Sequence, residues 1–173
     1  MACTEILQGY EHDCLSSVGG VEELYVTEFV NVPQANITAT SGTISALSTN
    51  PSEKFYTLQV GKNNASVEQK IISSPENGTQ YYEQTVTFNL KKMTAALRYT
   101  VKSLANNRLM IIYKDRNGVI WLLGQTTGMD AGEINGTSGQ QFGDLNGYTL
   151  TFTGMEPDHA STLSQSLLDG VLS

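Results

Sequence analysis

The sequence predicts a mainly β fold, namely an antiparallel β-sandwich or half-open barrel with one flanking α-helix. The chain has 173 residues, which is enough for a single domain with a core of its own. Segments rich in β-branched and aromatic residues recur along it, separated by turn sequences containing Gly, Asn and Pro. Only one stretch has the apolar spacing of a helix. These three observations favour strands over helices.

The N-terminal half is expected to contain an arm, a weak hairpin and several strands. Residues 1–20 lack apolar periodicity and end in serines and glycines, which predicts an N-terminal arm. Residues 21–32 predict a strand with Leu24, Val26 and Val30 on one face. Residues 33–51 predict a weakly hydrophobic hairpin or mobile loop that turns at Ser41-Gly42. Further strands are expected over residues 55–60, 65–73 and 80–90.

One helix is expected directly after the strand at residues 80–90. Thr94 can cap it, and Met93, Leu97, Val101 and Leu104 form one apolar stripe. With the weak hairpin set aside, the chain contains seven or so predicted strands, mostly antiparallel.

The C-terminal half is expected to contain three strands, a long loop and a tail. Residues 109–113 predict a strand buried on both faces, and residues 119–123 return from the turn after it. The Gly-rich residues 124–147 predict a functional loop, followed by a strand at residues 148–153. The tail, residues 158–173, has leucines and Val171 spaced as a short amphipathic segment that docks on its own or a neighbouring subunit.

Two of the predicted strands alternate between threonine and large apolar residues. The threonines are Thr85 and Thr87 in one strand, and Thr149, Thr151 and Thr153 in the other. Such alternation predicts a sheet with one wet face and one core face. The wet face of most sheets meets bulk water, whereas in a ring-forming protein it could line a channel.

Composition and motifs argue against catalysis, nucleotide binding and a metal site. Ten Lys and Arg against seventeen Asp and Glu give a net charge of −7, which disfavours simple electrostatic binding to nucleic acid or an anionic membrane. His12 and His159 lie beside no nucleophile in the sequence, and no phosphate-binding glycine motif occurs. The spacing of Asp130, Glu133 and Asp144 matches no calcium-binding pattern. We expect no enzymatic activity and no cofactor.

Two further features concern cysteines and membranes. Cys3 and Cys14 have no accompanying cysteine or histidine cluster, so a zinc site is unsupported. A disulfide between them and two free thiols both remain open, with free thiols favoured in a cytoplasmic assembly. No apolar run reaches the ~18 residues of a membrane span, so no membrane association is expected.

Half of the positive charge of the chain gathers around the predicted helix. The residues are Lys91, Lys92, Arg98, Lys102 and Arg108. A solvated helix face and a positive patch that meets an acidic neighbouring subunit both fit this cluster.

Three stretches carry a family resemblance: residues 77–93 (NGTQYYEQTVTFNLKKM), 114–124 (KDRNGVIWLLG) and 142–157 (FGDLNGYTLTFTGMEP). Together with the intervening helix and the N-terminal Cys3, Cys14 and Val18-Gly19-Gly20, they resemble the tail tube (major tail) proteins of tailed phages, particularly those infecting Bacteroidetes. The resemblance implies one tail-tube-like domain over residues 1–173. It also implies six subunits to a ring, stacked rings, and a β-barrel lumen that conducts DNA during ejection.

The resemblance further implies where such a protein acts and what it contacts. The protein would be made in the host cytoplasm and reside in the phage tail of the virion. Its partners would be copies of itself, other tail proteins such as the tape measure and terminator, a sheath if the tail is contractile, and DNA as passing cargo. The implied lumen-facing residues are Thr85, Thr87, Thr149, Thr151 and Thr153. The implied inter-subunit or inter-ring residues are Gln34, Ser41, Gly42, Gly128, Asp130, Glu133, Gly136, Lys91, Lys92 and Arg98.

Two other functions remain open at this stage. A non-catalytic β-sandwich module that binds carbohydrate or a receptor would need a platform of exposed aromatic residues, whereas Trp121 lies in an apolar strand and is expected in the core. A tail terminator or head-tail connector ring has a related fold.

Overall fold

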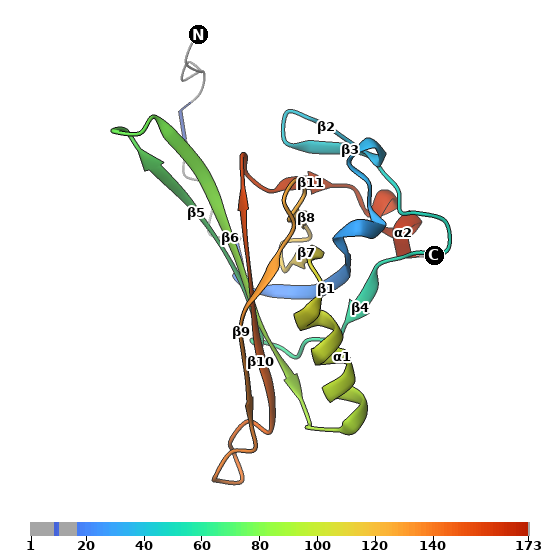
Figure 1. The fold of residues 1–173 in the computed structure, drawn as a ribbon, viewed down its shortest axis with the longest axis vertical. Coiled ribbons are helices and arrows are strands. Elements are labelled where there is room, and N and C mark those ends of the chain that lie inside the picture. The colour runs from blue at the N-terminus through green and yellow to red at the C-terminus, as the bar shows by residue number, and fades with distance from the viewer. Residues whose placement is uncertain (1–8, 11–16, 173) are drawn as a thin grey trace.

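The computed structural model describes residues 9–10 and 17–172, and these residues form two β-sheets and two α-helices (Figure 1). The predicted mainly β, sandwich-like fold with a flanking helix is confirmed, and a second helix is added to it. The helices are α1 (Ala95–Asn106) and α2 (Gln165–Leu172). The strands are β1 (Val21–Glu28), β2 (Ile37–Thr40), β3 (Thr43–Leu47), β4 (Tyr56–Leu58), β5 (Ala65–Ser74), β6 (Thr79–Lys91), β7 (Leu109–Asp115), β8 (Ile120–Leu123), β9 (Asp130–Thr137), β10 (Gly147–Glu156) and β11 (Ser161–Leu163).

The larger sheet has seven strands in the order β2-β3-β11-β8-β7-β1-β4. Its pairs are antiparallel except for β11 beside β3, which is parallel. The interior strand β7 is buried from Leu109 to Tyr113, as its unbroken apolar sequence predicts for a strand covered on both faces. The predicted hairpin turn at Ser41-Gly42 joins β2 to β3, and both residues have positive φ, as a tight type I′ turn requires.

The smaller sheet has four strands in the order β5-β6-β10-β9, all antiparallel. In β6 the side chains of Gln84, Val86, Phe88 and Leu90 are buried and those between them are half-buried, which confirms the predicted alternation. β10 alternates in the same way. One face of this sheet therefore packs in the core while the other points outward.

The first core lies between the two sheets and extends under α1. Phe88 of β6 and Phe152 of β10 stack there with ring centroids 5.9 Å apart, and both are fully buried. The predicted cap is present, since the backbone N–H of Leu97 donates to Thr94 Oγ1 at 3.1 Å. Val101 and Leu104 are the buried residues of α1. The helix thus closes one end of the sandwich.

The second core lies on the other face of the seven-stranded sheet, where α2 covers it (Figure 1). Leu168 and Val171 of α2 are buried against Met110, Ile112 and Leu122 of the sheet. The backbone N–H of Phe55 also donates to the carbonyl of Val171 at 3.0 Å. The C-terminal segment, whose docking partner the sequence left open, therefore docks on its own chain.

Three sequence predictions are wrong in detail. Met93 was predicted on the apolar stripe of the helix, but it precedes the Thr94 cap of α1 and is 44% exposed. Residues 124–147 are not one loop, because β9 runs through them and pairs with β10. In addition, β1 ends at Glu28, and Val30 lies in a 3-10 turn with 71% of its surface exposed instead of sharing a buried face with Leu24 and Val26. For β1 and β9, hydrogen bonding to a neighbouring strand determines where the strand begins and ends. The apolar pattern of the sequence is weak at these boundaries.

Most of the predicted arm, including Cys3, His12 and Cys14, lies outside the described residues. Its last residues contact the β7–β8 turn. The backbone N–H of Val18 donates to Asn117 Oδ1 at 2.9 Å, and Asn117 Nδ2 donates back to the Val18 carbonyl at 3.0 Å. This pair holds the entry to β1 against the seven-stranded sheet.

Candidate functional site: the threonine face and the edges of its sheet

The outer surface of the four-stranded sheet carries the five predicted threonines, and we call it the threonine face. The register pairs Thr153 with Thr85, Thr151 with Thr87, and Thr149 with Asn89. Directly opposed residues of an antiparallel pair lie on the same face. The structure therefore brings together, from strands about sixty residues apart in sequence, the side chains that the alternation had marked as one wet face.

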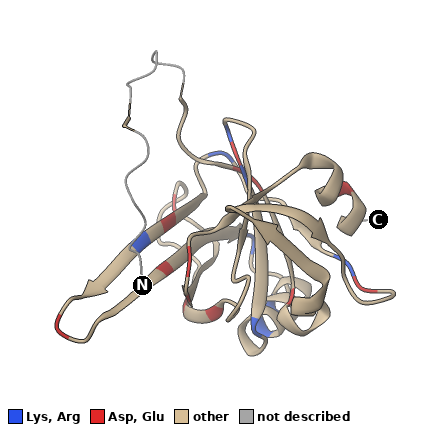
Figure 2. Cartoon of the chain, turned by 90° about the horizontal axis from the view of Figure 1, so that it is seen from above, with Lys and Arg blue, Asp and Glu red and all other residues tan. Residues whose placement is uncertain are grey.

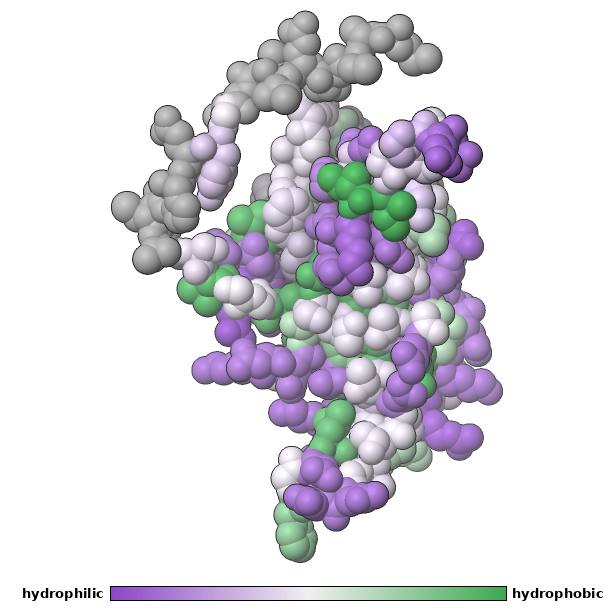
Figure 3. Space-filling view, turned by 90° about the vertical axis from the view of Figure 1, so that its left-hand side faces the viewer, coloured by the Kyte–Doolittle hydropathy of each residue, from purple (hydrophilic) through white to green (hydrophobic). Residues whose placement is uncertain are grey.

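Hydrogen bonds link these side chains across the strands. The hydroxyls of Thr87 and Thr151 are 3.2 Å apart, and Thr149 Oγ1 donates to Asn89 Oδ1 at 2.8 Å. Paired hydroxyls are polar yet uncharged, so the middle of the face is wettable without attracting ions strongly. In Figure 3, which views the molecule from this side, the central strip is close to white, the tone of weakly polar residues, with more hydrophilic purple groups to either side.

The charges on the threonine face are mainly acidic. The register places Glu83 of β6, Glu133 of β9 and the pair Glu68 and Lys70 of β5 on it. Lys70 Nζ lies 3.3 Å from Glu68 Oε2, and both side chains are more than half exposed. That pair is neutral as a unit, and Lys91 lies on the same face at the end of β6. Glu83 and Glu133 therefore leave the face with only a small net negative charge, which weakly repels polyanions.

The edges of the four-stranded sheet are β5 on one side and β9 on the other. Within the described residues, each pairs with one strand only. Each neighbouring pair in the sheet is antiparallel, so with four strands β5 and β9 run in opposite directions. Unpaired edges of this length are ready to accept a further strand from another chain.

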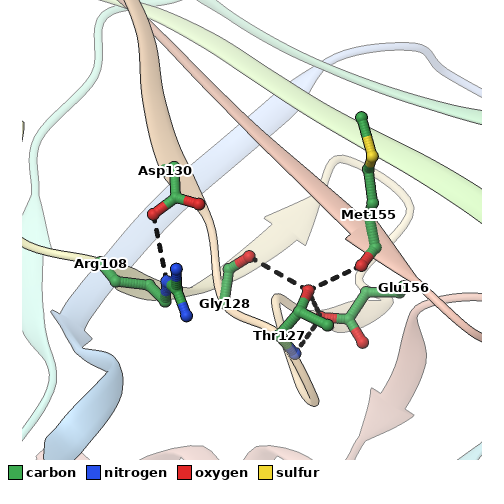
Figure 4. Close-up of polar contacts among 6 residues, drawn as sticks. All are labelled: Arg108, Thr127, Gly128, Asp130, Met155 and Glu156. Carbon is green, nitrogen blue, oxygen red and sulfur yellow. Dashed lines mark hydrogen bonds and ion pairs between the residues drawn. The ribbon is translucent and has the colours of Figure 1, made fainter.

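A small set of polar contacts fixes edge strand β9 in place (Figure 4). Arg108, just before β7, forms an ion pair with Asp130 at the start of β9, with Nε and Oδ1 3.1 Å apart. Next to it, Leu109 and Met129 exchange two backbone hydrogen bonds of 2.7 and 2.8 Å. Asp130, a predicted inter-subunit residue, is therefore engaged within its own chain.

Glu156, which sequence analysis did not single out, anchors the loop that leads into β9 (Figure 4). Its side chain is only 3% exposed. The carboxylate accepts the backbone N–H groups of Thr126 and Thr127, and the Thr127 hydroxyl, at 2.9–3.1 Å. A buried carboxylate needs such donors, so these bonds tie the loop to the end of β10. In the sequence, Glu156 falls on the same alternate positions of the strand as buried Leu150 and Phe152, which is the pattern of a side chain that points into the core.

The other predicted inter-subunit residues occupy different kinds of position. Gln34 donates to the carbonyl of Gln125, and the Gly42 carbonyl accepts from the backbone N–H of Thr162 at 2.9 Å. Gly128 is buried under the side chains of Arg108 and Phe29. Gly136 packs against the ring of Tyr148. These residues shape the subunit itself.

The remaining predicted residues are exposed. Ser41 is at the tip of the β2–β3 hairpin, and Glu133 is on the threonine face. Lys91, Lys92 and Arg98 lie at the end of β6 and in the first turns of α1, all open to solvent. Arg108 of the predicted basic cluster is also exposed but forms an ion pair with Asp130, whereas Lys91, Lys92 and Arg98 form no salt bridge within the described residues.

A small polar pocket lies beside the end of β10. The pocket, of about 210 Å³, is lined by Gln84, Glu156, Asp158 and His159 among others, and the His159 ring lies 4.3 Å from that of Tyr82. Among the described residues no group of three or more metal-ligating side chains is close enough to hold an ion. In the same part of the chain, no helix is both long and apolar enough to cross a membrane.

Two buried tyrosines have raised pKa values because burial disfavours the phenolate. The effect raises the pKa of Tyr113 to about 12, and burial with the nearby Glu23 raises that of Tyr25 further. Tyr113 stacks on half-buried Trp121 with ring centroids 6.4 Å apart. Both tyrosines are neutral packing groups at physiological pH.

Comparison of the chain with protein-family models, with curated proteins and with solved structures found no match.

Proposed function

We propose that this protein is a structural, non-enzymatic subunit of a phage tail tube. In this proposal, copies form hexameric rings that stack into a tube, and the tube conducts DNA during ejection. The observation that carries the proposal is the four-stranded sheet, which combines a wet threonine face with two unpaired edges among the described residues. The tail tube resemblance of residues 77–93, 114–124 and 142–157 supports it independently.

The directions of the edge strands suit closure into a ring. If β9 of one copy lies beside β5 of the next, the two strands run antiparallel, so the alternation of the sheet continues across the junction. The contact joins two different surfaces of the subunit, and contacts of that kind close into cyclic rings when the rotation permits. A closed barrel also removes the exposed edges that would otherwise promote aggregation.

Six copies would contribute 24 strands to such a barrel. With strands about 4.8 Å apart and tilted by about 40°, the backbone circle would be about 48 Å across. Side chains on the inner wall would still leave a water-filled bore that admits a DNA duplex. With the threonine face inward, the wall would be polar and mildly acidic, so DNA would slide along it without binding.

Electron microscopy of the purified full chain tests this proposal. We expect hexameric rings and tubes with an open bore, in equilibrium with smaller species by analytical ultracentrifugation. Tubes favour the tail tube role, whereas assembly that stops at single rings favours a terminator or connector. A chain that stays monomeric at high concentration, and is not incorporated when tails assemble around it, would refute the proposal.

A further inference from the structure

The two ends of the four-stranded sheet differ in chemistry, and this difference suggests how copies meet along the strand direction. The hairpin of β5 and β6 projects from the body at one end, shown at the top of Figure 1. The loop at residues 138–146, between β9 and β10, lies at the opposite end. We call the first end the hairpin end and the second the loop end. The register confirms this layout, since Glu156 pairs with Tyr82 near the hairpin end and Gly147 with Lys91 at the loop end.

Charge is distributed unevenly between these ends. At the hairpin end, Glu76, Glu83 and Asp158 outnumber Lys70, and Figure 2 shows acidic groups along the projecting hairpin. At the loop end, Lys91, Lys92 and Arg98 outnumber Asp144. One end is therefore acidic and the other basic. The loop end of one copy is complementary in charge to the hairpin end of another.

Each end also exposes a large apolar side chain. Phe142 is fully exposed in the loop, and Ile71, opposite Tyr82 on the hairpin, is 54% exposed. Residue 71 belongs to the face that is buried further along the sheet, but here the hairpin has passed beyond the body that would cover it. An exposed aromatic and an exposed aliphatic residue at complementary ends can bury each other on association.

The backbone next to Phe142 is held in a defined shape. Asp144 Oδ2 accepts the backbone N–H groups of Gln140 and Gln141, each at 2.9 Å. These two bonds hold the pKa of the Asp144 carboxyl below its ordinary value. The loop is thus preorganised around its ionised aspartate, which reduces the entropy lost when Phe142 docks.

We propose that copies of this chain associate end to end along the strands of the four-stranded sheet, with the loop end of one copy seated on the hairpin end of the next. Phe142 packs against Ile71, while Lys91, Lys92 and Arg98 face the acidic hairpin end. The contact joins different surfaces at opposite ends, so it repeats without closing and builds a filament. This inference rests on the proposed tail tube function and specifies its stacking contact.

Disulfide trapping tests the apolar contact directly. In a Cys3→Ser, Cys14→Ser background, the single variants I71C and F142C are mixed and oxidised. We expect the mixed dimer to form on the order of tenfold faster than in a mixture of I71C with Y99C, whose altered position is an exposed residue of α1. A rate equal to that control, or preferential F142C–F142C dimers, would overturn the proposal.

Charge exchange tests the electrostatic contact. K91E/R98E and E76K/D158K should each abolish tubes, whereas the four substitutions together should restore them because the complementarity is then reversed in sign. The control K54E, an exposed site near the second core, should assemble normally. Tubes that form equally well in either two-site variant would contradict the proposal.

The combined results separate this contact from the proposed function. If rings form but the I71C–F142C cross-link does not, the proposed stacking contact is refuted and the tube-subunit function still stands. If the cross-link forms but the chain never assembles into rings, the end-to-end contact is supported and the tail tube function is refuted.

Discussion

At the scale of single residues, the structure depends on two carboxylates with opposite surroundings. Glu156 is buried and accepts hydrogen bonds from the loop that leads into β9. Asp144 is exposed and organises the loop end of the four-stranded sheet. Both accept backbone N–H groups, so each carboxylate substitutes for the strand pairing that its loop lacks.

We expect Glu156→Gln to destabilise the fold. The amide nitrogen of glutamine would oppose a backbone N–H of Thr126 or Thr127, leaving a buried donor without an acceptor. The free energy of unfolding should fall by about 1–3 kcal/mol, measured by urea denaturation. Glu133→Gln, at an exposed position, is the matched control and should change it by less than about 0.5 kcal/mol. Equal effects at both positions would contradict the anchoring role of Glu156.

The loop around Asp144 should be sensitive to acid. A carboxyl whose pKa is lower in the folded protein stabilises the folded loop above its ordinary pKa of 3.8, and this contribution is lost as the pH falls through the lowered value. The amide NMR signals of Gln140 and Gln141 should therefore titrate together at a pH below 3.8. In Asp144→Asn this titration should disappear. A midpoint at or above the ordinary value would contradict the hydrogen-bonded arrangement.

At the scale of elements, α2 and β9 owe their positions to tertiary contacts. α2 has eight residues, too few to be stable alone, and its two buried side chains attach it to the seven-stranded sheet. β9 has half-buried Ala131 and Ile134 and no fully buried residue, so pairing with β10 and the contacts of Arg108 and Met129 define it.

Leu168→Ala should weaken the attachment of α2. The side chain is fully buried in the second core, so its truncation leaves a cavity and should cost about 2–5 kcal/mol of unfolding free energy. Calorimetry would measure the loss, with the exposed Ser166→Ala as the control. A cost below about 1 kcal/mol would mean that α2 does not cover the second core stably in solution.

Thr94→Ala should shorten or loosen α1. The substitution removes the acceptor of the Leu97 N–H and should cost about 1 kcal/mol of unfolding free energy. Thr100→Ala, which removes a side chain that bonds only to a carbonyl one turn earlier in the same helix, is the comparison variant. Hydrogen exchange should accelerate at the first turn of α1 in the first variant and stay unchanged in the second.

At the scale of the whole molecule, one sheet forms the hydrophobic cores and the other presents surfaces to the surroundings. The seven-stranded sheet is covered on both faces and holds both cores. The four-stranded sheet contributes one face to the first core and leaves the threonine face, two edges and two chemically different ends for contact with other molecules.

Replacing Thr149 and Thr151 with lysine should alter how assembled tubes treat DNA. The side chains point outward, so the monomer should keep its melting temperature within a few degrees. If the threonine face lines the bore, DNA co-sedimenting with tubes at low salt should rise at least about tenfold, and ejection should slow. Thr38→Lys with Thr40→Lys, on β2, is the control. Unchanged DNA retention and infectivity would place the threonine face elsewhere in the assembly.

Local patterns in the sequence determined much of this structure. The alternation in β6 and β10, the unbroken apolar run of β7, and the Thr94 cap of α1 with the later part of its stripe appear where they were predicted, because each pattern reflects which side of one element is buried. Met93 is the exception in that stripe, since it precedes the helix. The same alternation identified the five threonines as one outward face.

Only the tertiary structure decided how these elements are partitioned. The division into two sheets, the edge position of β9, the docking of α2 on its own chain and the anchoring by Glu156 depend on contacts between residues far apart in the sequence. A polar edge strand has no strong period of its own, since it gains stability from its neighbour and not from a buried face. The sequence could therefore mark which faces are wet, whereas long-range pairing determined where those faces, edges and ends lie relative to one another.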